Sequence, residues 1–364
     1  MTPDIDAVLY ETIHMKRFKS KMTTIKEVAR KAGVSVGTVS NVINGLDTVS
    51  ESIKQKVKEV IKELDYRPSR LAAGLSSKKT KNIGLVVPDI SSPFYSDLVK
   101  GISDKLQSLG YEMYLCNSNN SLEKEWEIMG NLKSMWVDGI ILIPVYDQSR
   151  DLGQLKNWTQ PLVILNRDLG LPEIDTILFD NFSGAYNAVS YLLDQGHQDI
   201  ICINGPKSSN SARERYLGWK RAMSERGMHK EDFLFWGNFS ITSGKKLMSE
   251  ALARFSCIDA VFATSDLLAL GAIKVINSKG LSVPEDISLM GFGDIFICQY
   301  LNPPLTTVAR PFEATGNKAV EVLVERIKNP EKKPERIIID GEIEERNSVA
   351  IKNSNPCPGQ GLLT

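Results

Sequence analysis

Apolar residues recur at helical spacing in three short segments between residues 25 and 64. Thr24 and Glu27 have the spacing of a capping box at the start of the first segment, and Gly33 ends it. Ser35 is placed to cap a second helix that runs to about residue 44, and Ser50 to cap a third. The first two helices are joined by a short turn that contains a glycine, which predicts a helix-turn-helix.

The predicted outer face of the second helix is small and polar and carries no acidic residue. It consists of Val36, Gly37, Thr38, Ser40, Asn41 and Asn44. A solvated surface helix normally carries Glu and Lys, whereas a helix in the major groove of DNA needs uncharged hydrogen-bonding groups. The pattern therefore favours DNA binding over the alternative of an arbitrary small helical bundle.

From residue 81 onward, apolar β-branched runs such as "NIGLVV", "GIILI", "PLVIL" and "DIICI" alternate with helical patterns. Strands that are apolar throughout and alternate with helices indicate parallel sheets covered on both faces. The units are too many for one open sheet, so we expect an α/β body of two lobes. A ligand should bind in the cleft between the lobes, at the carboxyl ends of the strands.

The remaining segments are short. Residues 68–75 could form one more short helix, marginal in isolation, before the polar basic linker "SSKKTK". The alternative is a flexible tether. Residues 1–21 match no element and are either a disordered arm or a stretch ahead of a true start at Met22. The tail from 353 to 364 contains Pro and Gly without periodicity, which predicts disorder, and it has no leucine heptads for a tetramer-forming helix.

The charge is zero overall but unevenly distributed. Residues 1–80 contain 15 basic and 9 acidic residues, so the remainder is correspondingly acidic. A basic head on an acidic body fits a chain that contacts phosphate at one end, although a solvated charge run would look the same. No apolar stretch reaches the length of a membrane span, and no secretory signal is present, so we expect a cytoplasmic protein.

Cofactor and catalytic motifs are missing. The five cysteines form no CxxC pair, and with three histidines they indicate no metal site; we expect them to be reduced thiols. Neither GxGxxG nor GxxxxGK[ST] occurs, and no convergent set of acid, base and nucleophile is recognisable. We therefore expect no cofactor, no metal and no enzyme activity.

The segment from Thr24 to Leu75 resembles the head of the lactose/galactose-repressor family without a gap, and "DISSPFYSDLVKGI", "ATSDLLALGAI" and "PPLTTVARP" extend the resemblance over the body. It implies a two-lobed periplasmic-binding-protein fold, a homodimer, and a hinge helix that folds on DNA and inserts a leucine into the minor groove. The candidate DNA contacts are Thr24, Ser35, Val36, Gly37, Thr38, Ser40, Asn41, Asn44, Tyr66, Arg70, Ala72 and Leu75.

The resemblance also implies effector contacts on loops at the cleft. The candidates are Asp89, Phe94, Tyr95, Asn166, Arg167, Ser211, Arg215, Phe239, Ser265, Asp266 and Asp294. One departure is that a position where the family often has an aspartate holds Gly293. A hydroxyl-binding carboxylate is therefore missing or supplied elsewhere, for which Asp89 is a candidate. Two alternatives stay open: Arg215 only bridges the lobes, and Phe239 is a core residue.

These observations predict an all-α helix-turn-helix head over 22–67, a hinge helix and linker over 68–80, and an α/β body with parallel sheets over 81–352. Within the body we expect an N-subdomain at about 81–179 and 311–335 and a C-subdomain at about 180–310 and 336–352. The predicted function is a transcriptional repressor of carbohydrate genes that binds a near-palindromic operator under control of a sugar. A solute-binding protein for transport and an enzyme on a doubly wound fold are the rival classes.

Overall fold

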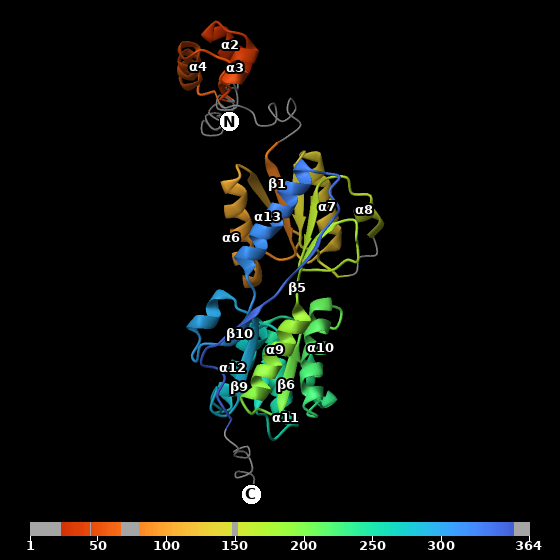
Figure 1. Cartoon of the computed structure of the whole chain (residues 1–364). Coiled ribbons are helices and arrows are strands. Elements are labelled where there is room, and N and C mark those ends of the chain that lie inside the picture. The colour runs from red at the N-terminus through yellow and green to blue at the C-terminus, as the bar shows by residue number, and fades with distance from the viewer. Residues whose placement is uncertain (1–22, 44, 67–79, 148–151, 353–364) are drawn as a thin grey trace, which may run out of the picture. The chain divides into compact units, whose positions relative to one another are not determined.

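The computed structural model describes residues 23–43, 45–66, 80–147 and 152–352 of the chain (Figure 1). It consists of two units, one ending at Thr80 and the other beginning at Lys81, which is where the sequence places the start of the body. The predicted N-terminal extension, the hinge helix and the C-terminal tail lie outside the described residues. None of the helices in the described ranges is long and apolar enough to cross a membrane.

The first unit holds the three predicted helices, α2 (Ile25–Ala32), α3 (Val36–Ile43) and α4 (Glu51–Glu63). The Glu27 amide donates to the Thr24 hydroxyl and the Thr24 amide to the Glu27 carboxylate, which confirms the capping box. Gly33 ends α2 with a φ of 66°, a conformation that favours glycine. The apolar faces of the three helices meet in one small core around Val28, Val39 and Val57.

The two other predicted helix caps differ in outcome. The Thr38 amide donates to the Ser35 hydroxyl at 3.0 Å, so Ser35 caps α3 as expected. Ser50 directly precedes α4, but its hydroxyl makes no capping hydrogen bond and lies 3.2 Å from the Ser52 hydroxyl instead. The predicted position of the third helix is right, and the predicted Ser50 cap is wrong because a neighbouring hydroxyl takes its place as partner.

The N-lobe of the body is built on a six-stranded parallel sheet in the order β11-β5-β4-β3-β1-β2. Helices α6 and α13 cover one face, and α7 with the short α8 packs against the other. The strands are β1 (Asn82–Val87), β2 (Glu112–Asn117), β3 (Gly139–Leu142), β4 (Leu162–Leu165), β5 (Asp175–Phe179) and β11 (Arg336–Ile339). The helices are η1 (Pro93–Tyr95), α6 (Ser96–Ser108), α7 (Leu122–Ser134), α8 (Leu152–Lys156) and α13 (Phe312–Lys328).

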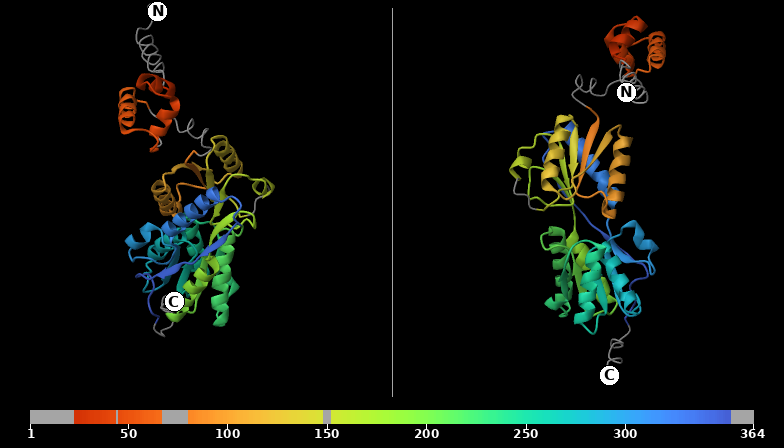
Figure 2. Two further views of the ribbon diagram at one scale, coloured as in Figure 1. Left: turned by 45° about the horizontal axis from the view of Figure 1, so that its top comes forward. Right: turned by 180° about the vertical axis from the view of Figure 1, so that it is seen from behind.

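The C-lobe repeats this plan with the order β12-β10-β9-β8-β6-β7, in which only β12 runs antiparallel to its neighbour. Helices α9 and α10 pack together on one face and α11 and α12 on the other (Figure 2). The strands are β6 (Ile200–Asn204), β7 (Leu234–Trp236), β8 (Ala260–Ala263), β9 (Ser288–Gly293), β10 (Thr306–Ala309) and β12 (Glu342–Glu344). The helices are α9 (Asn181–Asp194), α10 (Asn210–Glu225), η2 (Glu231–Phe233), α11 (Ile241–Arg254), α12 (Asp266–Ser278) and η3 (Phe296–Tyr300).

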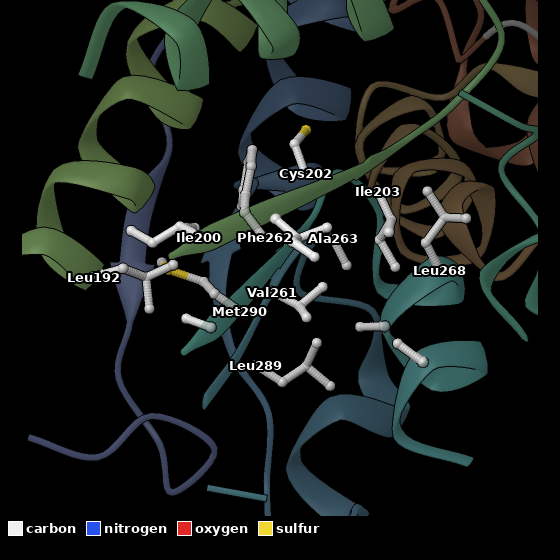
Figure 3. Close-up of a cluster of buried hydrophobic side chains, with 14 of the residues drawn as sticks. Leu192, Ile200, Cys202, Ile203, Val261, Phe262, Ala263, Leu268, Leu289 and Met290 are labelled. Carbon is white, nitrogen blue, oxygen red and sulfur yellow. The ribbon is translucent and has the colours of Figure 1, made fainter. Parts of the chain in front are cut away.

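The core of the C-lobe lies between this sheet and its helices. Phe262 and Met290, from neighbouring strands, are fully buried in a cluster that also contains Leu192 of α9 and Leu268 of α12 (Figure 3). Because both faces of the sheet are covered, its inner strands are apolar throughout, which is the pattern that predicts a parallel sheet from the sequence.

The chain passes between the lobes three times: after β5, after β10, and between β11 and β12. The first two crossings agree with the predicted boundaries near 179 and 310. The third does not, because β11 (Arg336–Ile339) pairs with β5 in the N-lobe sheet. Residues 336–339 therefore belong to the N-lobe, and the predicted boundary at 335 is corrected to about residue 340. The error arises because a strand that follows a long helix can join either sheet.

Candidate functional site

The outer face of α3 has the composition that the sequence predicts. Val39 and Val42 point into the core, whereas Val36 is 41% exposed and Gly37 is exposed beside it. The remaining predicted contacts in the first unit also reach solvent: Thr24 and Ser35 are exposed, and Thr38, Ser40, Asn41 and Tyr66 are partly exposed. This face offers hydroxyl and amide groups and no negative charge, as a surface that approaches phosphates and base edges requires.

Some of these groups are held by neighbours. The Ser35 and Thr38 hydroxyls lie 2.9 Å apart, and the Asn41 amide donates to the Thr48 hydroxyl at 3.3 Å. Tyr66 packs against the core of the three helices, and burial raises the pKa of its hydroxyl. Tyr66 therefore supports the unit as well as reaching solvent. Asn44, Arg70, Ala72 and Leu75 lie outside the described residues, so their predicted roles stay predictions.

The basic excess of the N-terminal part is not located on the three helices. Residues 23–66 hold seven basic and six acidic side chains, whereas residues 67–79 hold four basic and no acidic ones. The electrostatic attraction to phosphate that the sequence predicts must therefore depend strongly on the segment that follows α4.

In the body, a cavity of about 390 Å³ opens between residues of both lobes. Its lining comes from segments that directly follow the strands, at the carboxyl ends where ligands bind in open parallel sheets. Of the eleven predicted effector contacts, ten lie in this one lining: Asp89, Phe94, Tyr95, Asn166, Arg167, Ser211, Arg215, Phe239, Ser265 and Asp266. The structure thus brings together residues spread over almost 180 positions of the sequence.

Asp294 is the predicted contact that the structure does not place in the lining. Its carboxylate accepts a hydrogen bond from the Arg346 guanidinium at 2.7 Å, and this guanidinium also donates to the Leu305 carbonyl. Asp294 is therefore corrected to a structural ion pair that ties the end of β9 to the segment after β12.

The departure at Gly293 has a steric explanation. A β-carbon at Gly293 would lie 2.9 Å from the Asp266 carboxylate, and one at Gly291 would lie 2.3 Å from it. The Asp266 carboxylate is buried in this space, where it accepts from the Thr307 hydroxyl at 2.6 Å and the Ile295 amide at 3.0 Å. A side chain at position 293 would therefore require the buried Asp266 carboxylate to shift, and burial raises the pKa of Asp266 itself.

Arg215, in the first turns of α10, is 5% exposed and hydrogen-bonded within the C-lobe. Its Nε and Nη2 donate to the Asn181 side-chain oxygen at 3.0 and 2.8 Å, and its Nη1 donates to the Thr264 carbonyl at 2.6 Å. These partners belong to one lobe, so the alternative that Arg215 bridges the lobes finds no support in them. Burial lowers the pKa of Arg215 to about 10.

Arg310 lines the same cavity and was missed in the sequence analysis. It follows β10 and is 6% exposed, and its Nη2 donates to the Asn166 side-chain oxygen in the N-lobe at 2.6 Å. Its Nε is buried and has no hydrogen-bond partner. The available signal was its position: an arginine directly after an apolar strand in "TTVARP" stands where the other lining residues stand.

A second contact between the lobes lies at the rim of the cavity. Asp147, after β3, pairs with Arg167 at 3.1 Å and accepts from the Asn210 amide at the start of α10 at 2.6 Å. Nearby, the buried Glu125 carboxylate accepts from the Val145 amide at 2.8 Å, and burial raises its pKa to about 7. Arg167 is thus already paired with a carboxylate within its own lobe.

Aromatic rings form much of the apolar wall. Phe239 lines the cavity, and its ring also packs directly on Gly205, where a β-carbon would be 2.3 Å away. It is therefore both a wall of the cavity and part of the C-lobe packing. At the other side, the Asp89 carboxylate accepts from the Ser91 amide and hydroxyl at 3.0 and 2.7 Å, so one of its oxygens is engaged within its own loop.

A group of metal-ligand type within the described residues consists of Asp199, Cys257 and Asp259. Lys230 already pairs with Asp199, and Lys352 with Asp259, so ammonium groups neutralise both carboxylates. Cys257 is in a disulfide bond, so the expectation that all five cysteines are reduced is wrong for this residue. Cys116, Cys202 and Cys298 are free thiols, as expected.

Comparison with known proteins identifies the family of the chain. A family model described as bacterial regulatory proteins, lacI family, matches residues 24–69, and one described as a periplasmic binding protein-like domain matches residues 189–349. The HTH-type transcriptional regulator DegA of Bacillus subtilis is 35% identical over 336 residues, which cover 91% of this chain and 99% of DegA. This chain belongs to the lacI family. It is a DNA-binding transcriptional regulator and not an enzyme.

Other lacI-family proteins show the same correspondence over the full length. The HTH-type transcriptional repressor PurR of Pasteurella multocida is 37% identical over 321 residues, 88% of this chain and 96% of PurR. The lac repressor dimer bound to operator and an anti-inducer superposes with a TM-score of 0.83 at 27% identity, covering 91% of this chain and all of that one. A complex of the regulator CelR with cellobiose has a TM-score of 0.69 at 33% identity, covering 90% and 99%.

Proposed function

We propose that this lacI-family regulator is a repressor that binds a near-palindromic operator as a homodimer, and that a sugar or sugar derivative in the interlobe cavity sets its operator affinity. The observation that carries the proposal is the assembly of ten expected contact residues into one cavity at the strand ends of both lobes. A volume of about 390 Å³ falls at the lower end of the range for small-molecule sites, about 300–1,000 Å³.

The DNA side of the proposal rests on α3. Its exposed face presents Val36, Gly37, Thr38 and Asn41 without an acidic group, and the capped ends of α2 and α3 fix its orientation. One helix-turn-helix reads only a few base pairs, so two copies on a two-fold symmetric site are needed for specific binding. The similarity to a repressor solved as a dimer on its operator supports this arrangement.

The effector side rests on the composition of the lining. Ser211, Ser265 and Asn166 provide hydroxyl and amide groups, and Phe94 and Phe239 provide apolar faces for a ring. Buried hydroxyls of a sugar need such partners, since each one left unsatisfied costs about 1–3 kcal/mol. Among the similar structures, one holds cellobiose and another holds ribose, which supports a carbohydrate as the effector class.

The contacts that join the lobes at the cavity support the proposed coupling between the two sites. Arg310 donates to Asn166 across the lobes, and Asp147 accepts from the Asn210 amide. A ligand that engages these groups changes the relative free energy of lobe arrangements, and operator affinity follows if DNA binding prefers one of them.

The test begins with selection of operator sequences from random DNA, followed by titration with and without compounds that raise the melting temperature. We expect a near-palindromic site bound by two chains, with affinity that falls steeply with salt. At least one sugar or sugar derivative should change this affinity. A single chain on an asymmetric site, or operator binding that no stabilising compound alters, would contradict the proposal.

A further inference from the structure

Two of the most buried charged side chains in the body line the same cavity. Arg215 is 5% and Arg310 is 6% exposed. Neither has a carboxylate within ion-pair distance among the residues that the structure describes. The less buried arginines Arg167, Arg326 and Arg346 each pair with an aspartate, at 3.1, 2.9 and 2.7 Å. The most buried arginines are thus the ones without a carboxylate partner, although a buried charge needs a partner more than an exposed one does.

The hydrogen bonds of the two guanidiniums do not supply that partner. Arg215 donates to an amide oxygen and a backbone carbonyl, and Arg310 donates to the Asn166 side-chain oxygen; these are neutral acceptors. Each guanidinium has five N–H donors, so both keep unused ones, and the buried Nε of Arg310 has no partner. The donors that remain lie on side chains that line the cavity.

The carboxylates of the lining form no ion pair with either guanidinium, although the nearby charge of Asp266 partly offsets the lowering of both arginine pKa values. Asp266 directs its two oxygens to the Thr307 hydroxyl and the Ile295 amide. Asp89 accepts from Ser91, and neither carboxylate lies within 4.0 Å of a guanidinium of the pair. Burial lowers the pKa of Arg310, and the nearby charge of Arg215 lowers it further. The two positive charges therefore repel one another in a desolvated site.

Aromatic rings hold the guanidiniums in place instead. The Arg215 guanidinium lies 4.0 Å from the Phe292 ring centroid and 5.6 Å from that of Phe239. The Arg310 guanidinium lies 3.8 Å from the Phe179 ring and 4.5 Å from the Phe94 ring. Stacking on rings fixes the planes of both forks without neutralising their charge. The result is a pair of positioned guanidiniums that line the cavity without a carboxylate in ion-pair contact among the described residues.

We propose that the effector carries an anionic group, a carboxylate or a phosphate, and that Arg310 together with Arg215 binds it. This inference rests on the proposed effector function of the cavity and narrows it to acidic ligands such as sugar acids or sugar phosphates. A planar guanidinium fork matches both kinds of oxyanion, and its hydrogen bonds to them are stronger than those to a neutral hydroxyl.

The test compares ligands that differ in charge on the full-length protein. D-glucose, D-gluconate, D-glucuronate, D-glucose 6-phosphate and inorganic phosphate are each added at millimolar concentration, and the melting temperature and the calorimetric affinity are measured. We expect at least one anionic probe to bind on the order of ten- to a hundredfold more tightly than glucose, since charge-assisted hydrogen bonds exceed neutral ones by that much. Comparison of the two sugar acids with the two phosphate compounds shows whether the site prefers a carboxylate or a phosphate.

Variants assign the effect to Arg310. Arg310→Gln removes the charge and keeps an amide near Asn166, so the preference for the anionic probe over glucose should disappear. Arg310→Lys keeps the charge without the fork and should keep part of the preference. Arg346→Gln is the matched control, because Arg346 is paired with Asp294 outside the cavity; its ligand preference should equal that of the wild type. If Arg310→Gln does not fold, Arg310→Lys and the wild-type ligand series still decide.

The outcomes separate this inference from the proposed function. If glucose binds as tightly as the anionic probes, if no anionic probe binds, or if Arg310→Gln keeps the wild-type preference, the anion site is refuted. If a neutral sugar releases the operator from the wild type and from Arg310→Gln alike, effector control stands and the anion site fails. If an anionic probe binds through Arg310 but leaves operator affinity unchanged, the anion site stands and the proposed control fails.

Discussion

The unpaired charge of Arg310 should be visible in the stability of the protein without ligand. We consider Arg310→Met, which keeps a long apolar stem among the rings of Phe94 and Phe179 and removes the guanidinium. The substitution removes a buried charge and thereby relieves a desolvation cost of several kcal/mol. It also loses the stabilising hydrogen bond to Asn166, about 1.5–3 kcal/mol, and the cation–π contacts, about 0.5–2 kcal/mol each. The terms nearly cancel or favour the variant, so its melting temperature should equal or exceed that of the wild type.

Arg346→Met is the comparison, because it breaks a satisfied pair. Arg346 donates to Asp294 at 2.7 Å and to the Leu305 carbonyl at 2.8 Å, and its side chain is 15% exposed. Its loss should cost about 1–3 kcal/mol. At about 2–4 °C per kcal/mol for a domain of this size, the melting temperature should fall by several degrees. Calorimetric melts of both variants in an anion-poor buffer are the assay. If Arg310→Met melts as low as Arg346→Met, Arg310 is a satisfied structural residue and the reasoning is refuted.

Three further changes test other parts of the molecule. Thr24→Ala removes the capping box of α2 and should destabilise the first unit by about 1 kcal/mol, measured by thermal melts against Thr24→Ser, which keeps the hydroxyl. Asn41→Ala should weaken operator binding about tenfold or more in a DNA titration while Gln55→Ala, on the exposed side of α4, leaves it unchanged. The folded pKa of Glu125 is raised to about 7 by burial, above its unfolded value, so its contribution to stability is lost as pH rises from about 4.5 to 7. Glu125→Gln should remove that loss, about 1.4 kcal/mol per pKa unit, in urea unfolding measured across this range; an unchanged pH profile would show that Glu125 does not titrate there.

The sequence predicts the parts of the fold that local patterns determine. The capping box at Thr24 and the end of α2 at Gly33 are visible because each depends on residue types at fixed local spacing. The inner strands such as β6 are visible because burial on both faces leaves a continuous apolar run. Short strands at sheet edges were not foreseen: β7, β11 and β12 have three or four residues and are half exposed. The assignment of β11 to the N-lobe sheet depends on a pairing with β5 that no local pattern encodes.

The candidate site shows the same limit. Ten lining residues were found because each follows a predicted strand or matches a family element. Arg310 was missed because a lone arginine after a strand gives no sign of its burial, which comes from Phe179 and Phe94 packing around it in three dimensions. Asp294 was misassigned because its partner, Arg346, lies 52 positions away in the sequence and only the fold brings the two together.

The three passages of the chain between the lobes have a consequence for how a ligand acts. Arg310 lies on the second passage, between β10 and α13, and Arg215 is bonded to Asn181 at the end of the first. Any relative rotation of the lobes must change backbone dihedral angles in these same segments. A ligand that binds both guanidiniums therefore contacts the hinge segments themselves, so the same few residues recognise the ligand and control the relative rotation of the lobes. Substitutions in these hinge segments should consequently alter ligand affinity and the regulatory response of DNA binding together.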